Sequence, residues 1–297
     1  MEAIVAHSDA DGIISAVLLN KIKPTNNIYF SSNSYLLKTF CSLIIRGYST
    51  LSILDISPNK KTIILSSVFD KVNWIDHHIW EEFKIPENVN VFNEQVESTA
   101  KLVSKIFNIN DELVEIADEI DTNNVKSEKA DFFRKLISAI KWKYKNYQII
   151  KFRQIVKYLT ANQIEKLEKN EECAKVIDEF NFWLKEKIED LLERIRIVEV
   201  NNKKIILVES INGVPVYEIF NAIKSREDFD LLTVFYRRID YRTKKIITKL
   251  EFRSPNKIDV LKIARVLNGG GHKFASGCLL DYYLSQEDFV KKIETLL

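Results

Sequence analysis

Imidazole and carboxylate side chains gather in a few short segments of this sequence. The chain has only four histidines, and each adjoins an acidic cluster or a run of glycines: His7, His77, His78 and His272. Five of the seven glycines lie in the same neighbourhoods, although glycine is otherwise scarce. Scattered structural use would not concentrate both residue types in this way, so these segments are the first candidates for chemistry.

The first such segment has the sequence HSDADG and runs from His7 to Gly12, directly after an apolar run. We expect a strand to end here, and a compact turn to present one imidazole and two carboxylates before a helix begins at Gly12. The carboxylates of Asp9 and Asp11 would repel each other unless a cation lies between them, so a divalent metal is the natural partner. The structural alternative is a turn in which an aspartate caps the helix.

Two further acidic positions follow apolar runs. Asp55 ends one of them, although an aspartate before Ser and Pro also initiates turns. Asp76, His77 and His78 stand in sequence immediately after a second apolar run. The structural alternative for these three residues is a solvated polar loop. Mixed ligation by Asp and His favours a transition metal such as Mn²⁺ over Mg²⁺.

A last carboxylate comes from the end of a helix expected at 111–120. Asp121 is the preferred candidate because Ala117, one turn earlier, leaves room for close packing. Asp118 is expected to be a solvated helix charge, and it stays the alternative ligand.

The elements that position these residues alternate between apolar runs and helical patterns over the first 125 residues. Strands are expected at 4–6, 28–30, 51–54 and 72–75, and helices at 13–22, 35–46, 60–70, 98–107 and 111–120. This order predicts an α/β fold with a mostly parallel sheet covered by helices on both faces. In such sheets functional groups gather beyond the carboxyl ends of the strands, where the acidic segments fall.

The remaining chain changes character twice. Residues 126–195 are helical and highly charged, and a stripe from Val176 to Ile195 predicts an amphipathic helix, either packed on the protein or forming a homodimer seam. The later elements are strands at 197–200 and 204–209, a helix near 215–225, a hairpin at 231–253 and a helix at 257–267. The predicted domains are therefore a catalytic domain at 1–125, a helical connector at 126–195 and a smaller α/β substrate-binding domain at 196–297.

Length and composition limit the classes of function. A chain of 297 residues with 46% apolar content can fill two cores. Forty-four basic and 42 acidic residues leave a net charge of +2, which argues against a surface given over to long nucleic acid. The three cysteines are far apart and form no CxxC pair, which fits a reducing cytoplasm. No apolar run approaches the roughly 20 residues that a bilayer requires, so we expect no membrane partner.

Taken together, the segments resemble the DHH phosphoesterase superfamily, which includes RecJ-type exonucleases, nanoRNases and family II pyrophosphatases. Residues 7–12 are similar to its first motif, Asp55 to the second, 76–78 to the name-giving third and Asp121 to the fourth. Residues 97–100 resemble the helix start that follows the third motif in nanoRNase-like members. Residues 252–254 and 269–277 resemble the DHH-associated substrate-binding domain.

The resemblance implies two divalent ions, usually Mn²⁺, with Mg²⁺ or Co²⁺ as substitutes. The implied ligands are His7, Asp9, Asp11, Asp55, His77 and Asp121, with Asp55 as the bridge. Asp76 then orients a histidine, and His78 faces the phosphate as the second catalytic residue. Two such ions stabilise the charge that grows on phosphorus during in-line attack.

Substrate binding is expected in the C-terminal domain. Bare glycine backbone can approach an anionic oxygen closely, and an arginine offers a bidentate clamp for phosphate. The candidate substrate-binding residues are Arg253, Ser254, Gly269, Gly270, Gly271 and His272, with a tight helix-to-strand turn as the structural alternative for the glycines.

The leading hypothesis is an exonuclease that trims short single-stranded RNA or DNA to nucleoside 5′-monophosphates. The segment 141–158 favours longer strands, because cations interleaved with aromatic rings can track a backbone and stack bases. The alternative for this segment is an amphipathic helix whose rings lie in the core. The alternative functions are a RecJ-like exonuclease, a cyclic-dinucleotide phosphodiesterase, a phosphatase acting on 3′-phosphoadenosine 5′-phosphate, and a replication-associated scaffold without activity.

Overall fold

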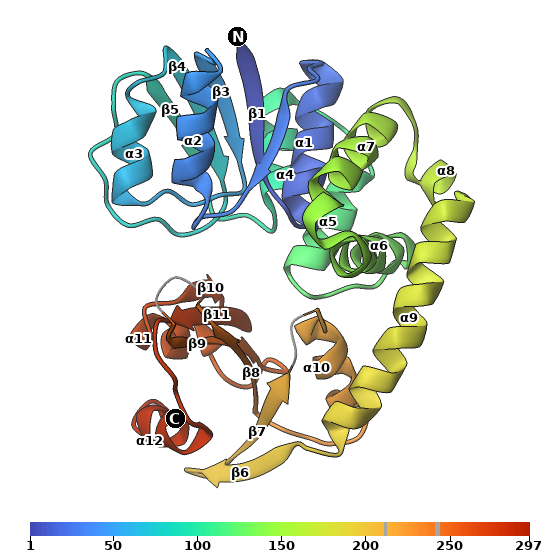
Figure 1. Ribbon diagram of the computed structural model, residues 1–297, viewed down its shortest axis with the longest axis vertical. Coiled ribbons are helices and arrows are strands. Elements are labelled where there is room, and N and C mark those ends of the chain that lie inside the picture. The colour runs from blue at the N-terminus through green and yellow to red at the C-terminus, as the bar shows by residue number, and fades with distance from the viewer. Residues whose placement is uncertain (211–212, 241–243) are drawn as a thin grey trace. The chain divides into compact units, whose positions relative to one another are not determined.

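The computed structural model describes residues 1–210, 213–240 and 244–297 and divides into two compact units, Met1–Ile177 and Asp178–Leu297. The boundary lies inside a long helix, α9 (Glu171–Leu192). Each unit is built around a sheet of its own (Figure 1). The three-part division with boundaries at 125 and 195 stays a prediction.

The first unit contains a five-stranded sheet in the order β2-β1-β3-β4-β5, in which every neighbouring pair is parallel. Its strands are β1 (Glu2–His7), β2 (Ile28–Ser31), β3 (Thr50–Leu54), β4 (Lys71–Asp76) and β5 (Val89–Asn93). Ile4 and Ala6 of β1 enter one core, whereas Ala3 and Val5 enter another. The sheet is therefore buried on both faces, as continuous apolar strands predict.

Helices cover the two faces of this sheet (Figure 1). One face carries α2 (Leu36–Ile45) and α3 (Lys60–Ser66), whose apolar residues share a core with Ala3 and Val5. The core on the other face is shared by α1 (Ala10–Ile22), α4 (Thr99–Phe107), α5 (Leu113–Asp121), α6 (Glu128–Tyr144), α7 (Gln148–Ala161) and α8 (Ile164–Glu168). The predicted fold class, a parallel sheet between helices, is confirmed.

The charged helices α6, α7 and α8 pack into the first unit, which ends inside α9. Phe133 of α6 and Phe152 of α7 are fully buried, and a single 3₁₀ turn, η1 (Lys145–Tyr147), joins the two helices. In α9, Val176, Phe180 and Leu184 of the predicted stripe are buried within one chain. This burial favours the packed helix over a dimer seam.

The second unit has a six-stranded sheet in the order β10-β11-β9-β8-β7-β6, parallel only between β7 and β8. Its elements are β6 (Arg196–Val200), β7 (Lys203–Ser210), α10 (Val216–Lys224), β8 (Leu231–Ile239), β9 (Ile246–Arg253), α11 (Val260–Val266), β10 (Gly270–His272), β11 (Ala275–Leu280) and α12 (Gln286–Ile293). The predicted hairpin at 231–253 corresponds to β8 and β9, and its residues 241–243 lie outside the described residues. Among the helices that the structure describes, none has both the length and the apolarity to traverse a bilayer.

Candidate metal centre

The candidate residues meet where the strand order of the first sheet reverses. β2 and β3 lie on opposite sides of β1, and ligand sites in open parallel sheets lie beyond the carboxyl ends of the strands at this point. β1 ends at His7, and Asp55 directly follows β3. His7 Nδ1 lies 2.6 Å from Asp9 Oδ2 and 3.6 Å from Asp55 Oδ2. These three side chains form the first ligand group.

Asp11, His77 and Asp121 form the second ligand group. His77 Nε2 lies 3.3 Å from Asp121 Oδ2 and 3.9 Å from Asp11 Oδ2. Nδ1 of the same ring lies 3.0 Å from the carbonyl oxygen of Val96. Because a carbonyl only accepts, Nδ1 carries the proton, and Nε2 is the nitrogen that faces the carboxylates.

Asp55 borders both groups. Its Oδ2 faces His7, whereas Oδ1 lies 3.7 Å from His77 Nε2 and accepts a hydrogen bond from Thr99 Oγ1 at 3.2 Å. The backbone of Asp55 has a φ of 60°, in the left-handed region that non-glycine residues seldom adopt. Such strain is typical of functional sites, and here it accompanies a buried carboxylate placed between two ligand groups.

Gly12 allows α1 to begin close against the end of β1. A Cβ at this position would lie 2.3 Å from the carbonyl oxygen of His7. Asp9 caps the helix, since its Oδ1 accepts the N–H of Gly12 at 3.1 Å. The helix-cap interpretation is therefore correct for one oxygen of Asp9, while the other oxygen belongs to the first ligand group.

The start of α4 holds the carboxylate of Asp11. The N–H groups of Thr99 and Ala100 donate to its two oxygens at 2.7 and 2.8 Å. Backbone donors at a helix N-terminus favour an anion, so this contact orients Asp11 toward the centre. The residue pattern at 97–100 indicated a helix start, but nothing in the sequence identified these two amides as partners of Asp11.

The two acidic candidates in α5 have different partners. Asp121 ends the helix and faces His77. Asp118 accepts a hydrogen bond from Ser98 Oγ at 2.6 Å and pairs with Lys101 Nζ at 3.1 Å, so it fastens the start of α4. This geometry supports Asp121 as the ligand.

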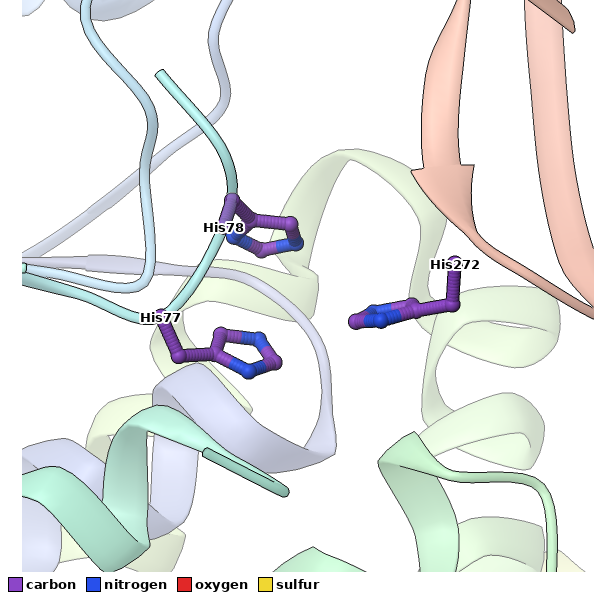
Figure 2. A group of neighbouring side chains, drawn as sticks. All are labelled: His77, His78 and His272. Atoms are coloured by element: carbon purple, nitrogen blue, oxygen red, sulfur yellow. The ribbon is translucent and has the colours of Figure 1, made fainter. Parts of the chain in front are cut away.

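Asp76 lies beneath His78 and is fully buried. His78 Nδ1 is 2.7 Å from Asp76 Oδ1, and the other carboxylate oxygen accepts hydrogen bonds from Trp80 Nε1 and Ser57 Oγ. Figure 2 shows the rings of His77 and His78 on adjacent residues, with centroids 4.4 Å apart. Burial lowers the pKa of His78, but the hydrogen bond and charge of Asp76 raise it to about 9. Sequence reasoning missed Ser57 and Trp80, whose residue types carried no signal.

The electrostatics of the centre favour a cation. Burial, together with the carboxylates of Asp121 and Asp9, raises the pKa of Asp11 to about 8. Burial and the charges of Asp11 and Asp9 hold the pKa of Asp55 well above its ordinary value. In each ligand group one donor atom per residue lies within 4.8 Å of the others. Imidazole nitrogens with carboxylate oxygens suit a divalent transition metal, so the residues present fit two such ions.

The candidate substrate residues lie in the second unit. Arg253 and His272 are both register partners of Ala275, on β9 and β10 respectively, so they project from one face of the sheet. Arg253 Nη1 also lies 3.4 Å from Glu251 Oε2. Ser254 is buried and its Oγ donates to the carbonyl oxygen of Asp230, which makes it a structural residue of this corner.

The glycine run joins α11 to β10. Gly269 N donates to the carbonyl oxygen of Ala264 at 2.7 Å in the turn after the helix, so the helix-to-strand turn is present, and the next two glycines begin the strand. Gly270 and Gly271 belong to β10, which pairs with β11. A Cβ on Gly269 would lie 2.2 Å from the carbonyl oxygen of Gly277, and Gly271 has a φ of 128°. Both glycines are thus needed for this pairing, whereas Gly270 has open space around it. His272, which Figure 2 also draws, follows in the same strand.

The aromatic residues of the segment 141–158 differ in burial, and Tyr147 is 67% exposed. Phe152 is fully buried against Phe30, and Tyr144 and Tyr158 pack against the same core. Lys151 pairs with Glu172. This packing favours the amphipathic-helix interpretation over a surface for long strands.

Comparisons with known proteins agree with this fold. Residues 3–132 match the DHH family, N-terminal domain. The first unit carries a DHH domain. A search of curated proteins found no match to the chain. All the residues of both ligand groups lie within the matched part.

Solved structures share the fold of the whole chain at low sequence identity. A pGpG-specific phosphodiesterase from Vibrio cholerae is 14% identical with a TM-score of 0.56, over 100% of this chain and 97% of that one. The DHH domain of a member of a family of ribosomal proteins is 14% identical with a TM-score of 0.68, over 99% and 86%. RecJ from Thermus thermophilus, in complex with Mn²⁺, is 13% identical with a TM-score of 0.60, over 100% and 52%.

Proposed function

We propose that this protein is a Mn²⁺-dependent phosphodiesterase that hydrolyses short single-stranded oligonucleotides to nucleoside 5′-monophosphates. The observation that carries the proposal is the pair of neighbouring ligand groups, with Asp55 of the first group 3.7 Å from His77 Nε2 of the second. Their donor atoms suit two divalent ions, and paired ions are typical of phosphoryl-transfer sites. The similar structures include a phosphodiesterase and RecJ with Mn²⁺, which supports the same chemistry.

Two of the ligands, Asp11 and His77, would be oriented by a second contact with backbone groups. His7, Asp9 and Asp55 would bind one ion, and Asp11, His77 and Asp121, with Asp55 as the shared carboxylate, the other. Thr99 and Ala100 orient Asp11, and the carbonyl of Val96 orients His77. When bound, two ions supply positive charge for the phosphate and lower the pKa of a water.

His78 would contact the phosphate directly. Its hydrogen bond to buried Asp76 favours the protonated ring, and that imidazolium would donate to an anionic phosphate oxygen. Asp76 is a positioning residue, since its carboxylate holds the ring through Nδ1. Arg253 and His272, on one sheet face of the second unit, would bind the terminal phosphate of a short strand.

The test is a digestion series with the full chain and Mn²⁺, using 5′-labelled RNA and DNA from dinucleotides to about 25-mers, with cyclic dinucleotides alongside. We expect the shortest linear substrates to disappear first and to yield 5′-monophosphates. His77→Ala should abolish hydrolysis because it removes a ligand nitrogen. Preference for long strands would replace the proposal with a RecJ-like exonuclease, and metal binding without any hydrolysis would favour a scaffold.

A further inference from the structure

A cavity of about 650 Å³ lies at the carboxyl end of β2, the edge strand of the first sheet. Ser8, which stands between His7 and Asp9, lines it. Ser31 also lines it, and is the register partner of His7. The cavity therefore opens beside the candidate metal centre, and its lining residues all belong to the first unit. Its volume is within the usual range of small-molecule sites, roughly 300–1,000 Å³.

The lining of this cavity is cationic. Lys38 and Arg46 come from α2 and the residue that caps it, and Arg153 comes from α7. No Asp or Glu is among the lining residues that the structure describes. Among the residues that the structure describes, none of these three cations forms an ion pair with a carboxylate. Other lysines and arginines of the first unit do form such pairs. Local positive charge without internal neutralisation is suited to an anion.

The two arginines converge on Tyr29. The guanidinium carbon of Arg153 lies 5.2 Å from the centroid of this ring, and that of Arg46 lies 6.0 Å from it. Arg153 Nε donates to the carbonyl oxygen of Ile28 at 2.6 Å, and Tyr29 is held by a hydrogen bond to Tyr48. A guanidinium has five N–H donors, so the anchored Arg153 keeps its terminal amino groups for a ligand. Planar guanidinium groups bind phosphate oxygens in pairs.

Neutral groups complete the lining. Ser31 Oγ and Thr39 Oγ1 lie 2.8 Å apart, and both belong to cavity residues. Tyr35, at the start of α2, is 62% exposed and offers a ring face at the rim. Hydroxyl groups suit a sugar, and an exposed tyrosine can stack a base.

We propose that this cavity binds the nucleotide adjacent to the bond that is cut, with Arg46 and Arg153 on its phosphate and its base against Tyr35. The inference rests on the proposed function, because it assigns the cavity to the same single-stranded substrate. The first unit would then bind a second nucleotide of the substrate. Substrates with at least one further nucleotide should therefore bind more tightly than a mononucleotide.

Binding is measured first without hydrolysis. The full chain in EDTA is titrated into a 3′-fluorescein-labelled RNA pentamer of adenosine, and anisotropy gives Kd at several KCl concentrations. Arg46→Gln and Arg153→Gln should each weaken binding about tenfold. Each should also reduce the slope of log Kd against log salt by about 0.7, the expected change for one phosphate contact to a single strand.

The matched control is Lys157→Gln. Lys157 is exposed on α7 one turn after Arg153 and does not line the cavity, so its removal tests for unspecific charge effects. Its Kd and salt slope should equal those of the unaltered chain. With Mn²⁺ present, the two arginine variants should show their defect in KM for the pentamer and not in kcat.

The outcomes separate the cavity from the activity. If both arginine variants bind the pentamer as tightly as the unaltered chain, the inference is wrong even where hydrolysis stands. If the chain hydrolyses nothing but binds RNA through the two arginines, the proposed function fails and the cavity assignment holds. If inorganic phosphate displaces the pentamer as effectively as adenosine 5′-monophosphate does, the cavity is a simple anion site and the nucleotide assignment is overturned.

Discussion

Asp118 and Asp121 stand one helical turn apart, yet their carboxylates lie in different surroundings. Asp121→Asn should abolish tight binding of one Mn²⁺ ion, because an amide is a poor substitute for an anionic ligand beside His77. Isothermal titration with Mn²⁺ checks this by the number of ions bound.

The comparison variant is Asp118→Asn. It should keep both ions and lose only stability, by about 1 kcal/mol, through weaker contacts with Ser98 and Lys101. A result in which Asp118→Asn loses the ion and Asp121→Asn keeps it would reverse the assignment.

The raised pKa of Asp11 predicts that the stability of the metal-free chain depends on pH. Its pKa is about 8 when folded against an ordinary value of 3.8, so the folded state binds the extra proton. The stability that this gives is complete at acidic pH and is lost as pH rises toward 8. In EDTA, Tm should therefore fall between pH 6 and pH 8.

Mn²⁺ should change the sign of this dependence. An ion competes with the proton for Asp11, so its affinity should rise with pH up to about 8. Thermal melts at fixed Mn²⁺ should then show a Tm that is level or rises over the same interval. Parallel Tm curves with and without Mn²⁺ would contradict a cation bound at Asp11.

Much of the candidate centre could be predicted at the residue scale, because strand ends, turn residues and paired acids are visible in the sequence. The contacts that hold the ligands in place could not be predicted from the sequence. Val96, Thr99 and Ala100 act through backbone groups that every residue type offers. Asp118 and Asp121 could not be separated with certainty either, since residues three apart on a helix share a face.

At the scale of elements, the close approach of α1 to β1 makes Gly12 difficult to replace. Gly12→Ala would push a methyl group against the carbonyl of His7, and such overpacking costs about 3 kcal/mol. For a unit of this size the expected fall in Tm is about 6–12 °C.

Gly270→Ala is the control for this substitution, because a Cβ there meets nothing within 4 Å. Its Tm should change by no more than about 2 °C, as for surface changes in general. Calorimetry of the two variants decides the matter, and equal effects would show that the contact at Gly12 can relax.

The predicted elements were those with a strong local pattern. The four apolar strands β1 to β4 and the helices between them were found because their periodicity is clear. β5 was missed, since Phe92 and its polar neighbours are exposed on this edge strand and give no apolar run. The pairing of β10 with β11 was missed as well, because glycines at 269–271 are as typical of a turn as of a strand.

At the scale of the whole molecule, the two units have separate sheets and cores. Every proposed metal ligand belongs to the first unit. Mn²⁺ at about 100 times its Kd should stabilise that unit by about 2.7 kcal/mol per site. Calorimetry should therefore show a transition that Mn²⁺ moves upward and one that it leaves in place, whereas a single transition that shifts as a whole would show that the units unfold together.

The proposed ligands extend along the chain from His7, at the end of the first strand, to Asp121, at the end of α5. In the unfolded chain these groups are far apart, and bringing them together costs loop-closure entropy. Ions should therefore bind only after the sheet and α5 have assembled. An ion held by both ends of such a long segment opposes the separation of those ends, so the rate at which the DHH domain unfolds should fall as the Mn²⁺ concentration rises.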